Sequence, residues 1–224
     1  PTRRSSVLVV SVFYPAWKWV HDPSHKFLCG SNEATLATRD SLKMRTLVES
    51  DWYQDNWSTI VKISQDQREK TLFMNTERGH RESQGVGGKI TGKRGDTLIW
   101  DDPHDAKQAD SDVQRQTILE SWDMSWSSRM NDPNSSAAIV IMQRVHDNDI
   151  TGHLLSKTEQ NWTHLAIPMR YDSEIIYDAG SDIGRPELND PRREDKALMF
   201  PERFSEDTVK DLESDLGPYG SAGQ

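Results

Sequence analysis

The sequence predicts an α/β fold in which a mainly parallel sheet is covered by helices on both faces. Two observations lead to this class. Short apolar runs rich in β-branched residues recur along the 224-residue chain, and segments with the spacing of amphipathic helices separate them. Strands that alternate with helices pair in parallel, because the connecting helix returns the chain to the same end of the sheet.

Six runs have the length of strands: KFLCGS (26–31), TIVKIS (59–64), TLFMN (71–75), TLIWD (97–101), AAIVIMQ (137–143) and THLAIP (163–168). Helical spacing is expected over residues 33–49, 109–130 and 205–216, with Gly217 and Pro218 ending the last helix. Residues 170–200 mix acids, glycine and proline without periodicity. The chain is therefore expected to divide into a core, 1–170, and a surface excursion with a linker or lid helix, 171–224.

Composition narrows the class of protein. The net charge of −9 lacks the basic footprint of a protein that grips nucleic acid with its whole surface, so any such contact must be local. The single cysteine, Cys29, is expected in a buried strand and fits a reducing compartment. No apolar stretch approaches the roughly 18 residues of a membrane span, so we expect a soluble protein. We expect core positions for four tryptophans, Trp17, Trp19, Trp52 and Trp57, rather than a surface on which DNA bases stack.

The stretch TLIWDDPHD (97–105) carries the most specific chemistry, because it places Asp101 and Asp102 at the end of an apolar strand. Ligands of open α/β sheets bind at the carboxyl ends of strands. Neighbouring side chains in a strand point to opposite faces, so both acids share one site only where the strand ends, and Pro103 fits such an ending. One carboxylate could hold Mg²⁺ while the other polarises a water that attacks a phosphate. An ordinary Asp-Pro turn after a strand is the structural alternative.

Several blocks in order resemble the large terminase subunit of tailed bacteriophages. They are VFYPAW (12–17), TRDSLKMRTLVESDWYQ (38–54), GGKITGKRGDTLIWDDPHD (87–105), AAIVIMQRVHDNDITGHLL (137–155), MFPERFS (199–205) and the ending LGPYGSAGQ. The resemblance covers essentially the whole chain and implies its N-terminal packaging ATPase domain, with a P-loop NTPase-like fold of the ASCE type. It implies an enzyme that hydrolyses ATP with Mg²⁺ to move double-stranded DNA into a procapsid.

The resemblance also implies partners and a location. A homo-oligomeric ring would dock on the portal protein in the host cell cytoplasm, together with the small terminase subunit. Nuclease activity would belong to a part of the protein beyond Gln224, and the sequence is accordingly expected to be a fragment.

By resemblance, Asp101 would be the magnesium-side acid and Asp102 the residue that orients the attacking water. Arg94 would act as an arginine finger, often across a subunit boundary, with Lys93 as its alternative. The structural alternative is that Arg94 and Lys93 are two solvated cations in a turn. Farther along, Gln143 would sense the γ-phosphate.

The coupling of phosphate state to movement would continue through Arg144 and His146. A hydrogen-bonded loop is the structural alternative for this segment.

The opening turn departs from the family pattern. Residues 1–7, PTRRSSV, occupy the place of the phosphate-binding loop, with Ser6 where lysine is expected, Val7 where Ser or Thr is expected, and no glycine. Charge and hydroxyl groups for nucleotide binding would then come from Arg3, Arg4, Ser5 and Ser6. Propensity favours a strand over residues 5–12, whereas the resemblance implies a helix after the loop.

Two alternatives from other classes stay open. The altered loop fits a catalytically degenerate domain with a role in assembly or DNA binding. Clustered carboxylates also fit a metal-dependent nuclease, whose mark would be a third acid that converges on Asp101 and Asp102.

Overall fold

The computed structural model describes residues 7–105, 109, 111–165, 168–172 and 192–222, with the backbone alone for 216–222. The chain divides into two compact units, Thr2–Met142 and Gln143–Gln224. The expected division into an ATPase core and a linker stays a prediction. None of the helices in the described ranges combines the length and the apolar character that a membrane crossing requires.

The first unit is built on a six-stranded sheet of order β2-β3-β4-β1-β5-β6. Its strands are β1 (Lys26–Ser31), β2 (Ile63–Arg68), β3 (Leu72–Asn75), β4 (His80–Gly85), β5 (Thr97–Asp101) and β6 (Ala137–Ile141). Strands β4, β1, β5 and β6 run parallel, while β2, β3 and β4 are antiparallel neighbours. The expected α/β class with a mostly parallel sheet is confirmed.

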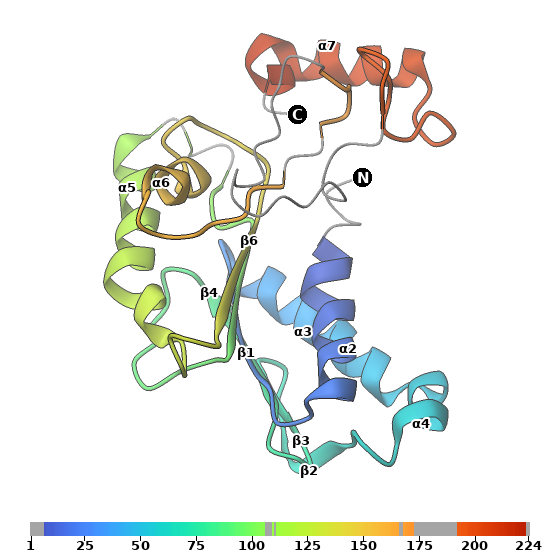
Figure 1. The fold of residues 1–224 in the computed structure, drawn as a ribbon, viewed down its shortest axis with the longest axis vertical. Coiled ribbons are helices and arrows are strands. Elements are labelled where there is room, and N and C mark those ends of the chain that lie inside the picture. The colour runs from blue at the N-terminus through green and yellow to red at the C-terminus, as the bar shows by residue number, and fades with distance from the viewer. Residues whose placement is uncertain (1–6, 106–108, 110, 166–167, 173–191, 223–224) are drawn as a thin grey trace. The chain divides into compact units, whose positions relative to one another are not determined.

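Helices cover both faces of this sheet, as Figure 1 shows, with α2 and α3 on one side and α5 on the other. The helical elements of the unit are η1 (Val9–Phe13), α2 (Tyr14–His21), α3 (Ala34–Glu49), α4 (Asp51–Trp57), α5 (Asp112–Ser121), η2 (Trp122–Trp126) and η3 (Ser127–Arg129). The second unit holds α6 (Ile150–Ser156) and α7 (Glu206–Ala222).

Strand β5 is the centre of the core, since all five of its residues are buried. Ile99 belongs to the apolar cluster that η1, α2 and α3 close over the sheet. Trp100 faces the other side, where its ring meets Trp122 and Trp126 edge to face at 5.0 and 5.3 Å between centroids. Side chains alternate along a strand, so Asp101 falls on the same face as Ile99, towards the first helices.

Three of the strand assignments differ from expectation. The strand expected at 59–64 forms as β2, but it begins only at Ile63 and runs through polar residues. Polar side chains are tolerated there because β2 is a partly exposed strand with antiparallel pairing. No strand forms in the described part of 163–168. Strand β4 was not expected, because its sequence HRESQG is polar, although Arg81 and Ser83 are buried.

The chain from Val7 onward is helical, which confirms the helix that the resemblance implies and rules out a strand over these residues. The stop expected at Gly217 and Pro218 is wrong, since α7 continues to Ala222. Both residues lower helix propensity without forbidding helical dihedrals. Trp19 is fully buried, but Trp17 and Trp52 are 56% and 61% exposed, so the core positions expected for these two are wrong.

A packing prediction concerns Gly30 of β1. A Cβ atom there would lie 2.7 Å from Trp126 Cη2 and 3.1 Å from Val86 Cγ1. Both neighbours are buried and cannot retreat easily. We expect Gly30→Ala to lower the free energy of unfolding by about 1–3 kcal/mol, as overpacked cores do. Urea unfolding followed by tryptophan fluorescence measures this change.

Gly87→Ala is the matched control, because a Cβ at Gly87 meets no atom within 4 Å. That variant should stay within about 0.5 kcal/mol of the wild type. Equal stability of the two variants would mean that Trp126 does not pack against β1.

Candidate functional site

The carboxyl ends of three parallel strands meet at one edge of the sheet. Ser31, the last residue of β1, is in register with Asp101 of β5, which is in turn in register with Ile141 of β6. Backbone hydrogen bonds continue this alignment past the strands. Asn32 N donates to Asp102 O (3.1 Å), and Asp102 N donates to Ile141 O (2.8 Å). The two predicted acids therefore lie at the edge where open α/β sheets bind ligands.

Strand β5 ends at Asp101 because the backbone of Asp102 adopts the left-handed conformation, with φ of 45°. Aspartate tolerates this region better than most side chains. The alternation of the strand stops here, which is the condition under which both acids share one site. The Asp102 carboxylate is near enough to raise the pKa of Asp101.

Asp101 is a buried carboxylate that lacks a full set of partners. The residue is 8% exposed. Its Oδ2 accepts a long hydrogen bond from Ser11 Oγ (3.4 Å), and its Oδ1 has no hydrogen-bond partner among the described residues. Burial, followed by the negative charges of Asp102 and Asp40, raises the pKa of Asp101 to about 7. Carboxylates in this state are typical of binding and catalytic sites.

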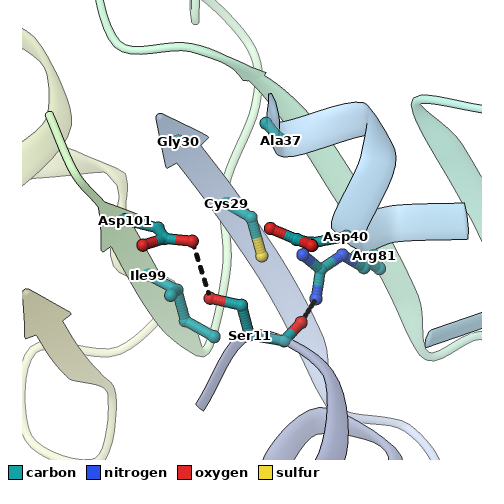
Figure 2. Close-up of a pocket in the computed structure, with 8 residues that line it drawn as sticks. All are labelled: Ser11, Cys29, Gly30, Ala37, Asp40, Arg81, Ile99 and Asp101. Carbon is teal, nitrogen blue, oxygen red and sulfur yellow. Dashed lines mark hydrogen bonds between the residues drawn. The ribbon is translucent and has the colours of Figure 1, made fainter. Parts of the chain in front are cut away.

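A small cavity of about 10 Å³ opens beside Asp101, close to the room that one water molecule requires. Figure 2 shows its lining, with Asp101 and Asp40 on opposite sides of Cys29. The lining residues are Ser11, Cys29, Gly30, Ala37, Asp40, Arg81, Ile99 and Asp101. The cavity therefore joins β1, β4 and β5 with the first helix and α3.

Arg81 fixes the first helix to this cavity. It is 1% exposed, and its NH1 donates to the Ser11 carbonyl oxygen (2.5 Å) while its Nε donates to Ser83 Oγ (3.3 Å). The carbonyl oxygen of Ser11 thus accepts a hydrogen bond from β4, and the hydroxyl of Ser11 donates one to β5. Sequence reasoning placed neither residue at this cavity, because Arg81 belongs to a polar stretch and Ser11 to a run of β-branched residues.

The opening turn, with Arg3, Arg4, Ser5 and Ser6, lies outside the described residues. The helix that follows it begins within the described range at Val7. Ser11 lies about one turn later on this helix and reaches Asp101. The segment directly after the turn therefore contacts the predicted metal-side acid.

The structure does not bring Arg94 and Asp102 together within one chain. Arg94 precedes β5, and its NH1 donates to Met130 O (3.1 Å). The four residue steps of the strand separate its two ends by about 13 Å. Lys93 Nζ is engaged with Glu82 Oε1 at 2.9 Å. A finger role for Arg94 across a subunit boundary stays a prediction.

The coupling residues belong to the second unit. Arg144 Nε donates to Asp149 Oδ2 (2.9 Å), and Asp149 is fully buried and caps α6 by accepting from Gly152 N (2.9 Å). His146 Nδ1 accepts from the backbone N–H of Asn148 (3.0 Å). Gln143 is exposed. These hydrogen bonds all lie within one loop and the start of α6. The coupling role of Gln143, Arg144 and His146 stays a prediction.

The acids at this edge fit a magnesium ion that is shared with a ligand. In the described part of the chain, no three His, Cys, Asp or Glu side chains are grouped so that they could hold a metal. Asp40 is the second acid that lines the cavity beside Asp101, but its oxygens accept from Arg39 and Lys43. Mg²⁺ usually takes one or two carboxylates and completes its shell with water and phosphate oxygens. The unpartnered Oδ1 of Asp101 can supply such a ligand.

Comparisons with protein-family models and with curated proteins gave no match for this chain. The fold and the site define an α/β protein with a carboxylate pair at the carboxyl edge of a mostly parallel sheet.

The raised pKa of Asp101 gives a prediction for the pH dependence of stability. The folded state favours the protonated carboxyl, so its contribution is fully present below the ordinary pKa of 3.8 and is lost as pH rises through about 7. This rise corresponds to at most about 4 kcal/mol at about 1.4 kcal/mol per pKa unit. We expect Asp101→Asn to be more stable than the wild type at pH 8 without metal, and equal to it near pH 4.

Urea unfolding at a series of pH values measures this difference. The matched control is Asp55→Asn, which changes an exposed acid of α4 and should show no such trend. An Asp101→Asn variant that is no more stable than the wild type at pH 8 would contradict the burial of an uncompensated carboxylate.

Proposed function

We propose that this chain is the packaging ATPase domain of a tailed-phage large terminase, which hydrolyses ATP with Mg²⁺ to move double-stranded DNA into a procapsid. The ordered blocks of sequence resemblance support this assignment. The observation that carries it is the buried Asp101 carboxylate, with one unpartnered oxygen among the described residues, next to Asp102 at the carboxyl end of an interior parallel strand.

The two acids differ in their surroundings, which suits two roles. Asp101 is nine-tenths buried and resists ionisation, so a cation beside it compensates a charge that the protein leaves unbalanced. Asp102 has left the strand and is only half-buried, so its carboxylate can orient a water for in-line attack. When bound, Mg²⁺ neutralises charge on the phosphate oxygens.

The remaining parts of the proposal follow from the resemblance. Arg3 and Arg4, with Ser5 and Ser6, would bind the phosphates in the place of a standard loop. A homo-oligomeric ring docked on the portal protein, with the small terminase subunit, would place basic residues along a DNA pore in spite of the acidic net charge.

One observation favours a second candidate. Val7 is 6% exposed and aliphatic, at the position where a hydroxyl is expected to reach the metal. The alternative is a catalytically degenerate terminase domain that serves in assembly or DNA binding.

ATP turnover in the presence of procapsids and double-stranded DNA decides between the two. We expect magnesium-dependent hydrolysis by the wild type and a loss of kcat of about 10²-fold or more for Asp102→Asn, since a residue that activates the nucleophile contributes on that order. Asp55→Asn, which changes an exposed acid, should keep wild-type activity. A wild type without magnesium-dependent turnover would establish the degenerate alternative.

A mixing experiment tests Arg94. Asp102→Asn and Arg94→Gln chains should each be inactive, the first for lack of a water-orienting acid and the second for lack of a neighbour's cation. Mixed rings contain interfaces in which an intact Asp102 meets an intact Arg94, so we expect activity to return on mixing. Mixtures as inactive as either variant would contradict a role for Arg94 across the boundary.

A further inference from the structure

Arg39 is a cation near the candidate site that the sequence did not single out. It lies in the second turn of α3, and its side chain is 49% exposed. Its Nε donates to Asp40 Oδ1 (3.0 Å) and its NH2 donates to Asp40 Oδ2 (2.8 Å). Such a two-bond fork fixes the plane of the guanidinium. The NH1 group forms no hydrogen bond to any residue in the described ranges.

The anchor of this guanidinium is a buried, charged carboxylate. Asp40 is 2% exposed and accepts a further bond from Lys43 Nζ (3.0 Å). Burial alone acts to raise the pKa of Asp40, but the hydrogen bonds from Arg39 and Lys43 outweigh it and hold the pKa below its ordinary value. One anion therefore serves two cations, and a positive charge remains at the surface of α3.

The start of α3 is fixed beside the acid pair. The helix follows β1 directly, the last residue of β1 is in register with Asp101, and Asn32 N donates to Asp102 O (3.1 Å). Asp40 and Asp101 line the same cavity. The hydrogen-bonded Asp40 contributes most to raising the pKa of Arg39, and the charges of Asp101 and Asp102 also raise it. Arg39 is thus within electrostatic reach of both acids.

We propose that Arg39 contacts the phosphates of the ligand, so that a polyphosphate chain binds between its outward edge and the Asp101–Asp102 pair. This inference rests on the proposed nucleotide site. Two carboxylates by themselves repel a polyphosphate, and a guanidinium whose Nε and NH2 groups are held by Asp40 offers its remaining donors in fixed positions. Lys43 shares the Asp40 anchor but lies four residues farther along α3, about 6 Å down the helix axis.

The test compares Arg39→Gln with Lys43→Gln in the full 224-residue chain. Both variants remove one cation from Asp40, so both share any structural effect of that loss. Titration calorimetry measures the affinities for Mg²⁺ alone, for inorganic triphosphate with Mg²⁺, and for ADP with Mg²⁺. Arg39→Lys, which retains the charge without the fork, is a further variant, and circular dichroism verifies that each protein is folded.

We expect Arg39→Gln to weaken binding of both phosphate ligands about tenfold or more, as loss of a charge-assisted bond does. Binding of Mg²⁺ alone should be unchanged or tighter, because a cation near the acids has been removed. Lys43→Gln should change phosphate affinity less than about twofold, and Arg39→Lys should fall between the wild type and Arg39→Gln.

Equal weakening in Arg39→Gln and Lys43→Gln would overturn the inference, because Arg39 would then act only through Asp40. Unchanged phosphate binding in Arg39→Gln would also overturn it while leaving the proposed ATPase intact. Arg39-dependent binding of inorganic triphosphate without any binding of ADP would support the contact between Arg39 and phosphate. It would count against the proposed ATPase. Absence of binding by the wild type would overturn both.

Discussion

The carboxylate of Asp101 is buried at the end of β5, and a buried charge requires a partner that compensates it. Among the described residues, the hydroxyl of Ser11 is its one hydrogen-bond donor, at 3.4 Å, while Asp102 and Asp40 add negative charge nearby. This arrangement opposes folding at neutral pH instead of supporting it. An uncompensated buried charge of this kind is expected where a protein binds a ligand, and a bound cation would compensate it.

The rest of the first unit fixes that carboxylate in place. The apolar cluster under α2 and α3 holds one face of β5, and the ring of Trp100 locks the other face against Trp122 and Trp126. Parallel pairing with β1 then sets which residues meet at the edge, since Ser31 and Asp101 are register partners. Because these contacts are buried, they constrain the position of the edge, and a bound polyphosphate would meet groups that are already oriented.

The sequence predicted the parts of this site that depend on a single element. Strand β5 is a continuous apolar run, so its end and both acids followed from local pattern. Strand β4 did not follow from local pattern. Its buried residues include Arg81, whose hydrogen-bond partner is a carbonyl oxygen on a helix 70 positions away in sequence. Arg39 was equally hidden, since a charged residue on an amphipathic helix resembles a solvated face until the tertiary fold brings it within electrostatic reach of the acids.

A crystal of the chain grown with Mn²⁺ and ADP would locate the cation directly through its anomalous scattering. The account predicts a peak within coordination distance of Asp101 Oδ1, about 2.2 Å for such an ion and a carboxylate oxygen, with the diphosphate between that peak and α3. A peak at another place, or ADP bound away from Asp101, would contradict the claim that this buried carboxylate serves a nucleotide-bound metal.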